Sequence, residues 1–158
     1  MQLVFDIETD GLLDEMTMCH VLVCQDYKTK KIYRYAYQLN YPSIESGLAF
    51  MKNADALIGH NIIGFDLMAL EKLFNWQPSS KTVIIDTWVM SQVLDYQRPH
   101  KHGLGGWGSY LGYEKQDNTV FNEQNWKIFS KQMLDYCTND VKLNTKVYEI
   151  LLQELNKI

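Results

Sequence analysis

The sequence predicts an α/β fold in which helices flank a mixed five-stranded sheet. Three short runs rich in branched and aromatic residues come first, which is typical of strands that follow one another directly. Apolar segments with helical spacing then alternate with two more short runs. Adjacent strands favour an antiparallel meander, whereas strands joined through helices favour parallel pairing, so we expect both arrangements in one sheet.

The antiparallel meander is expected within the first 37 residues. The first strand lies in residues 1–10, where the apolar side chains are Leu3, Val4, Phe5 and Ile7. A loop over Thr9–Thr17, a strand over Cys19–Asp26, a polar turn over Tyr27–Lys31 and a strand over Lys31–Tyr37 follow.

Helices and two more strands are expected over the rest of the chain. Pro42 fits the first turn of a helix, because the N–H that proline lacks has no helical partner there. In order, we expect a helix from Pro42 to about Lys52, a strand over Ala56–His60, a helix over Phe65–Phe74, a strand over Val83–Ile85, a helix from Thr87 to about Leu94 and a short helix over His102–Leu111. A polar loop over Asp117–Gln124 leads to a long amphipathic helix from about Ser130, with core positions at Met133, Cys137, Val141, Tyr148, Leu151 and Leu155.

Composition excludes several classes of protein. With 158 residues, the chain fits one domain with a real core, and no apolar run approaches membrane-spanning length. The formal net charge of −4 argues against a broad duplex-binding surface, although it leaves room for gripping a few nucleotides through metals and stacking. The three cysteines are not spaced as a zinc site, so we expect reduced thiols and a cytoplasmic protein.

Two acidic residues interrupt the first strand. Asp6 and Glu8 alternate with apolar neighbours, so their side chains project from one face. Like charges held this close raise each other's pKa, and a divalent cation between them would relieve the repulsion. An arbitrary Asp-x-Glu is more often the wetted face of a strand, so the interpretation depends on further carboxylates.

Asp140 is a second acidic residue in an apolar setting. It falls between Cys137 and Val141 on the core-facing side of the last helix, where carboxylates are rare unless paired or bound to a metal. Tyr136 lies one helical turn earlier, so its phenol and the carboxylate can act on a common atom. A surface tyrosine with a rotated Asp140 is the alternative.

A third group of polar residues follows the fourth expected strand. In Gly59-His60-Asn61-Ile62-Ile63-Gly64-Phe65-Asp66, a strand end passes through a loop into a helix, which is where open α/β sheets bind ligands. Asp66 could instead cap the helix, and Asn61 could be a turn former. Asp86 repeats the pattern more weakly, and we interpret it as mainly structural.

Together these motifs resemble the DEDD superfamily of 3′–5′ exonucleases, in the subgroup with tyrosine in the third motif. The motifs are Asp6-x-Glu8, Asn61 with Phe65-Asp66, and Tyr136-x-x-x-Asp140, and they span nearly the whole chain. Their form is similar to the proofreading domain of family A DNA polymerases of T7-like phages, which share the Asn61-to-Asp66 spacing and the Trp-Gly-x-x-Leu-Gly of residues 107–112. The resemblance implies a DnaQ-like, RNase H-like fold.

The resemblance also implies a site for two Mg²⁺ or Mn²⁺ ions. Asp6 would bridge the ions, Glu8 and Asp140 would complete the site for the nucleophilic water, and Asp66 would serve the second ion largely through water. Two ions about 3.5–4 Å apart can clamp the attacking and leaving oxygens of a phosphodiester. Oxygen ligands suit Mg²⁺ or Mn²⁺, whereas Zn²⁺ prefers the His or Cys ligands that this set lacks.

Roles for the neighbouring residues are implied in the same way. Tyr136 would orient the attacking water, since a phenol with a pKa near ~10 is a poor general base at neutral pH. Substrate contacts would come from a Leu12 wedge against the terminal base, from Thr9 and Glu8 at the terminal 3′ hydroxyl, and from Asn61 and Phe65.

The expected function is therefore metal-dependent 3′–5′ exonuclease activity. One domain over residues 1–158 would hydrolyse single-stranded or frayed DNA 3′ ends to nucleoside 5′-monophosphates, in proofreading or DNA degradation in a bacterial or phage-infected cytoplasm. Family A polymerases continue into a polymerase domain, so either a separately encoded DNA polymerase is a partner or the chain is part of a longer protein. An RNA-trimming exonuclease is one alternative. A non-catalytic module is the other, and the presence of all four carboxylates and Tyr136 argues against it.

Overall fold

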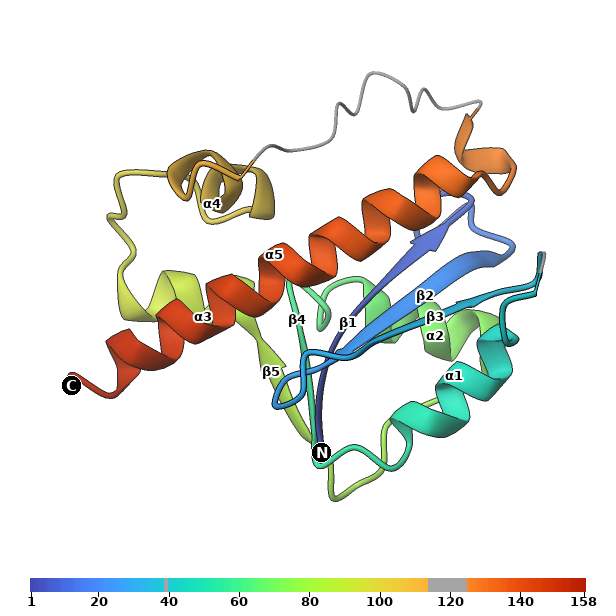
Figure 1. Cartoon of the computed structure of the whole chain (residues 1–158), viewed down its shortest axis with the longest axis horizontal. Helices are drawn as coiled ribbons and strands as arrows, with labels where there is room; N and C mark the ends of the chain where they lie inside the picture. Colours follow the sequence, from blue (N-terminus) through green and yellow to red (C-terminus); the bar gives the residue numbers. More distant parts are fainter. Residues whose placement is uncertain (39, 114–124) are drawn as a thin grey trace.

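A five-stranded mixed sheet forms the centre of the molecule. The structure is a computed structural model that describes residues 1–38, 40–113 and 125–158. Strand order is β3-β2-β1-β4-β5, with β1 at Gln2–Thr9, β2 at Cys19–Asp26, β3 at Ile32–Ala36, β4 at Ala56–Gly59 and β5 at Val83–Asp86. The first three strands pair antiparallel, and β4 and β5 run parallel to β1 (Figure 1). The predicted mixed sheet is confirmed.

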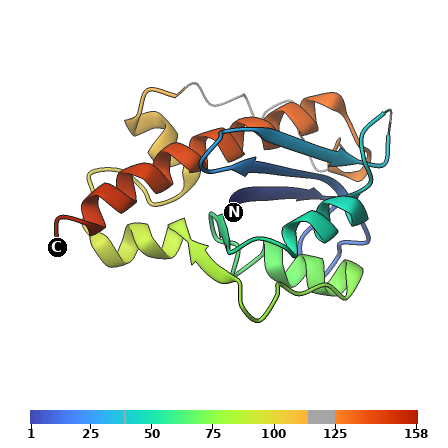
Figure 2. The ribbon, with the colours of Figure 1, turned by 60° about the horizontal axis from the view of Figure 1, so that its bottom comes forward.

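Helices cover both faces of this sheet. One face carries α1 (Ile44–Met51) and α2 (Asp66–Phe74), and the other carries the long α5 (Lys131–Leu155), which crosses β1 and β2 (Figures 1 and 2). Two more helices, α3 (Thr87–Leu94) and α4 (Leu104–Tyr110), pack against the C-terminal half of α5. A 3₁₀ turn, η2 (Asn125–Lys127), precedes α5. The predicted Asp117–Gln124 loop lies outside the described residues.

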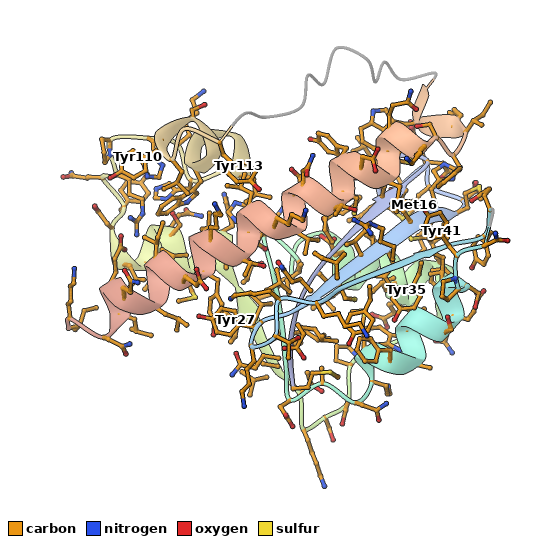
Figure 3. The ribbon with its side chains drawn as sticks, in the orientation of Figure 1. Met16, Tyr27, Tyr35, Tyr41, Tyr110 and Tyr113 are labelled. Carbon is orange, nitrogen blue, oxygen red and sulfur yellow. The ribbon has the colours of Figure 1, made fainter. Side chains whose placement is uncertain are left out.

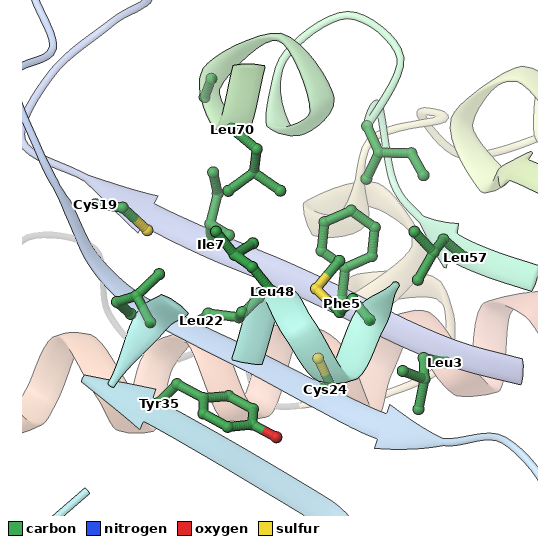
Figure 4. Packing of buried hydrophobic residues seen from close by; sticks show 14 of the residues in the cluster. Leu3, Phe5, Ile7, Cys19, Leu22, Cys24, Tyr35, Leu48, Leu57 and Leu70 are labelled. Carbon is green, nitrogen blue, oxygen red and sulfur yellow. The ribbon is translucent and has the colours of Figure 1, made fainter. Parts of the chain in front are cut away.

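Alternating side chains of β1 divide the core in two. Leu3, Phe5 and Ile7 pack beneath α1 and α2, as Figure 4 shows. Val4 points the other way and packs with residues of α5 that include Cys137. Because successive strand residues alternate faces, the even-numbered Asp6 and Glu8 are directed to the α5 side.

Close packing and aromatic contacts hold the helices on the sheet. A Cβ at Gly47 in α1 would lie only 2.7 Å from Leu22 Cδ2 and from the Tyr35 ring, so α1 approaches β2 and β3 as only glycine permits. Across the sheet, the ring of Tyr27, which is labelled in Figure 3, meets the ring of Tyr148 edge to face with centroids 5.1 Å apart. These contacts fix both helix layers relative to the β2–β3 side of the sheet.

Two sequence predictions are corrected at the ends of helices. Helix α1 begins at Ile44, not at Pro42, because the Pro42 carbonyl accepts a bond from the Ala36 amide while Ser43 Oγ caps the helix through the Ser46 amide at 3.2 Å. Leu155, expected in the core, is 47% exposed because the last turn of α5 projects past the sheet (Figure 1). In the part of the chain that the structure describes, no helix combines the length and apolarity needed to cross a membrane.

Candidate active site

Asp6 and Glu8 meet α5 at the carboxyl end of β1. Glu8 is 9% exposed. Asp6 is half-buried as a whole residue, but its carboxylate group is buried. Cys137 Sγ of α5 lies 3.5 Å from both the backbone oxygen and Oδ2 of Asp6. One oxygen each of Asp6 and Glu8 and the Cys137 sulfur all lie within 4.8 Å of one another, in a geometry that could hold a metal ion.

Asp66 approaches the same part of β1 from the edge that faces β4. Strand β4 pairs with β1 only from Gln2 to Val4, so the later residues of β1 have no strand neighbour on that side. The buried Asp66 carboxylate occupies this edge, where Oδ1 accepts a hydrogen bond from the Ile7 amide at 3.3 Å. Asp66 is therefore the first residue of α2 without being its cap, which is Phe65.

Burial and mutual repulsion make these carboxyl groups hard to ionise. Burial, followed by the charge of Asp66, raises the pKa of Asp6 well above its usual value. Burial raises the pKa of Glu8 in the same way, and the charges of Asp6, Asp140 and Asp66 raise it further. Burial also raises the pKa of Asp66 to about 7. Concentrated carboxylates of this kind favour a divalent cation with oxygen ligands.

Helix α5 contributes Tyr136 and Asp140, one turn apart and both half-buried. Asp140 lies close enough to Glu8 for its charge to add to the rise in the pKa of that carboxyl, after burial and the charge of Asp6. The Tyr136 ring packs edge to face against Trp126, with centroids 6.4 Å apart and an interplanar angle of 83°. The structure therefore brings the third predicted motif to the first two.

Asp86 fixes the loop that carries Asn61 and leads into α2 at Asp66. The Asp86 carboxylate accepts hydrogen bonds from the amides of Asn61 at 2.9 Å and Ile63 at 3.1 Å, and it also caps α3. Before this loop, a Cβ at Gly59 would lie 2.1 Å from Ile62 Cγ2, so the turn requires glycine. Asn61 has a positive φ of 60°. These contacts agree with a structural role for Asp86.

A cavity of about 590 Å³ opens beside the acidic cluster, which is within the usual size range of ligand pockets. It is lined by Ile7, Glu8, Thr9, Asp10, Gly11, Leu12, Glu15, Phe65, Trp126 and Lys127. Three of the four predicted substrate contacts, Thr9, Leu12 and Phe65, thus lie together, and Leu12 is 73% exposed. Asn61 is exposed and lies outside this lining.

The β1–β2 loop that bears Leu12 is held by hydrogen bonds. The Asp10 carboxylate accepts from the amides of Thr17 at 2.8 Å and Met18 at 3.2 Å, and from the Thr17 hydroxyl. Buried Met16 anchors the same loop in the core (Figure 3). Leu12 therefore projects from an ordered support.

Three residues at the site were not predicted from the sequence. Cys137 was assigned only to the core, because helical spacing does not show which turn of the core-facing side meets the acidic strand. Trp126 and Lys127 lie in a short 3₁₀ turn without hydrophobic periodicity. An aromatic–basic pair shortly before the Tyr136 motif was the available signal.

Comparison with known proteins identifies the family. A family model described as 3′-5′ exonuclease matches residues 2–156. The DNA-directed DNA polymerase of Enterobacteria phage T3 is 26% identical over 187 residues, which cover 96% of this chain and 27% of the polymerase. The chain thus spans about a quarter of the length of that relative.

Solved structures share the fold at lower sequence identity. Brucella melitensis NrnC with bound Mg²⁺ is 20% identical, with a TM-score of 0.69 over 99% of this chain and 74% of NrnC. Escherichia coli RNase D, an exoribonuclease involved in structured RNA processing, is 15% identical, with a TM-score of 0.69 over 99% of this chain and 40% of RNase D. The match over residues 2–156 and the RNase H-like architecture confirm the predicted resemblance, and the chain belongs to the 3′–5′ exonuclease family.

Proposed function

We propose that this protein removes nucleotides one at a time from single-stranded or frayed DNA 3′ ends and releases nucleoside 5′-monophosphates. The main support is the convergence of Asp6, Glu8 and Asp66 beside a nucleotide-sized cavity, which Glu8 lines. Carboxylates at one side of an otherwise partly apolar pocket suit a substrate whose base is held while its phosphate meets cations.

The donor set fits a pair of hard divalent ions. We propose that Asp6, Glu8, Asp66 and Asp140 hold two Mg²⁺ or Mn²⁺ ions. Burial raises the pKa values of Asp6, Glu8 and Asp66, and neighbouring carboxylates raise them further, so a divalent cation would relieve the cost of ionising these groups. When bound, the ions would supply charge neutralisation for phosphodiester hydrolysis. The Cys137 thiol would remain a hydrogen-bond donor to Asp6, since burial raises its pKa well above the usual value.

The remaining roles fall to residues beside this centre. Tyr136 would donate a hydrogen bond that orients the attacking water, and its packing against Trp126 supports a fixed ring. Leu12 and Phe65 would pack against the terminal base in the cavity. The Thr9 hydroxyl donates to the Gly11 carbonyl at 2.8 Å, so it would meet the terminal 3′ hydroxyl with its remaining acceptor capacity.

DNA is proposed as the substrate because the sequence relative is a DNA polymerase. The structural neighbours include an exoribonuclease, so the decisive experiment compares both polymers. Matched DNA and RNA single strands, labelled at either the 3′ or the 5′ end, are incubated with and without Mg²⁺. We expect immediate mononucleotide release from 3′-labelled DNA and a ladder from 5′-labelled DNA, only with metal. Faster degradation of RNA would reassign the substrate, and release from the 5′ end would contradict the proposal.

We further propose that residues 1–158 act as one exonuclease domain that serves a DNA polymerase, encoded separately or within the same longer protein. Support comes from the single sheet covered on both faces and from the polymerase relative. The three cysteines are buried and free, which supports the proposed cytoplasmic, reducing compartment.

A further inference from the structure

Trp126 and Lys127 add a wall to the cavity that none of the predicted motifs provides. The cavity is otherwise lined by the end of β1, the loop after it and Phe65. Trp126 is half-buried and Lys127 is exposed, and both come from η2, far along the chain from the other lining residues. The wall therefore presents a large aromatic ring next to an exposed cation.

His20 fixes this wall through a β-bulge. Glu8 pairs with Val21 whereas Thr9 pairs with Cys19, so His20 is the extra residue in β2. Bulges re-aim side chains and are common next to active sites. His20 is 2% exposed, and its Nε2 lies 2.9 Å from the Trp126 carbonyl oxygen. Because a carbonyl only accepts, Nε2 carries the hydrogen and donates it to η2.

Trp126 also connects the cavity to the predicted catalytic tyrosine. Its ring packs edge to face on Tyr136, so a base lying against Trp126 would lie one ring away from the group proposed to orient water. Aromatic rings bind bases of any sequence because every base has a π face.

Lys127 places a positive charge in a cavity whose other charged residues, within the described lining, are acidic. The described lining residues include the acids Glu8, Asp10 and Glu15, and among them Lys127 is the only cation. A nucleic acid brings more negative charge to this place. An exposed ammonium group on a flexible stem is suited to a backbone phosphate, which it can reach without reading sequence.

We propose that Trp126 stacks on the 3′-terminal base and Lys127 binds a phosphate of the same strand, with His20 as the positioning residue that holds both. This inference rests on the proposed function and names further substrate contacts in its cavity. These contacts would bind the strand whatever its nucleotide sequence and would not involve the metal ligands.

The stacking contact is tested with a DNA single strand that carries 2-aminopurine as its 3′-terminal base. In chelator, where hydrolysis is not expected, wild-type protein should quench the fluorescence of this base as it stacks. Trp126→Ala should raise Kd by roughly 5- to 150-fold, and Trp126→Phe should raise it less. The control is Tyr96→Ala, which removes an aromatic ring that is 77% exposed outside the cavity lining. An absence of quenching by the wild type, or an unchanged Kd for Trp126→Ala, would overturn the contact.

The phosphate contact is tested by the salt dependence of the same Kd. Lys127→Met should lower the slope of log Kd against log salt by about 0.7, the single-strand value for one neutralised phosphate. Lys28→Met is the matched control, because Lys28 is exposed in the β2–β3 turn and does not line the cavity. Trp126→Ala should leave the slope unchanged. Equal slopes for wild type and Lys127→Met would remove Lys127 from the inference.

The positioning role of His20 is tested by rescue. In His20→Gln, the side-chain amide can still donate to the Trp126 carbonyl, whereas His20→Leu cannot. We expect a Kd near the wild-type value for His20→Gln and a rise for His20→Leu that approaches that of Trp126→Ala, with KM following Kd. Equal Kd values for both variants would contradict the role of the hydrogen bond.

Hydrolysis by the wild type separates this inference from the proposed function. If the wild type hydrolyses 3′ ends and Trp126→Ala retains the wild-type Kd and KM, only the further inference fails. If the wild type quenches 2-aminopurine but releases no nucleotide with Mg²⁺ or Mn²⁺, the proposed function fails and the binding wall stands.

Discussion

The surroundings of the buried carboxylate of Asp86 differ from those of the carboxylates at the end of β1. Asp86 accepts hydrogen bonds from the amides of two loop residues and two helix residues, so its carboxylate oxygens have hydrogen-bond donors within the fold. Asp6, Glu8 and Asp66 instead face one another, and in the described residues none of the three takes part in an ion pair. Four amides of the fold thus stabilise the Asp86 carboxylate, whereas the carboxylates at β1 repel one another, which favours a cation supplied from outside.

The largest expected effect is the loss of activity when the cluster is broken. Asp6→Ala or Asp140→Ala should lower 3′-end hydrolysis by more than about a thousandfold, because a ligand charge is lost at the reacting phosphate. Single-turnover release of labelled mononucleotide in Mg²⁺ measures this. Robust hydrolysis by Asp6→Ala would remove Asp6 from the proposed metal site.

Tyr136→Phe should have a smaller effect that is confined to the rate. Removing one transition-state hydrogen bond is worth about 1.5–4 kcal/mol, so turnover should fall by roughly ten- to a thousandfold. The Mg²⁺ concentration that gives half-maximal activity should stay the same, because a neutral phenol adds no charge to the site. Wild-type turnover in Tyr136→Phe would return this residue to a packing role.

Stability should change in opposite directions for the Asp86 carboxylate and for the carboxylates at the end of β1. Asp86→Ala leaves buried amides without their acceptor and should destabilise the protein by about 1–3 kcal/mol, with or without Mg²⁺. Asp6→Asn removes a repelled charge and should leave the melting temperature in chelator unchanged or raised. Thermal melts of both variants in chelator provide the comparison, and a loss of stability in Asp6→Asn matching that of Asp86→Ala would end the distinction.

A gentler effect is expected from pH. Burial raises the pKa of Asp66 to about 7, above the unfolded value of about 3.9. Stability from a raised pKa is complete below the unfolded pKa and is lost as pH rises through the folded pKa. In chelator, this group should therefore lower the melting temperature progressively as pH rises from about 4 to about 8.

Glu154 should respond to pH in the opposite sense. Its hydrogen bond to Arg98 lowers its pKa, so its contribution to stability is lost as pH falls.

The raised pKa of Asp66 is tested with Asp66→Asn. Melting in chelator across the same pH range should be flatter for Asp66→Asn than for the wild type. Parallel curves for both proteins would contradict the raised pKa of Asp66.

The sequence predicted the sheet and most of the acidic site because both depend on local patterns. Alternation placed Asp6 and Glu8 on one face, and helical spacing placed Tyr136 beside Asp140. The position of Cys137 against Asp6 depends on the angle at which α5 crosses β1, which spacing does not determine. His20 and Trp126 depend on a bulge and a short 3₁₀ turn, whose effects on side-chain direction become visible only in three dimensions.

Thermal melting with and without Mg²⁺ tests most directly whether Asp6, Glu8 and Asp66 form a site for divalent ions. For wild-type protein, Mg²⁺ at about a hundredfold excess over its Kd should raise the melting temperature by about 5–10 °C. Asp6→Asn should melt at the wild-type temperature or higher in chelator and gain much less from Mg²⁺. A wild-type melting temperature that ignores Mg²⁺ and Mn²⁺, or an equal gain in both proteins, would contradict the assignment.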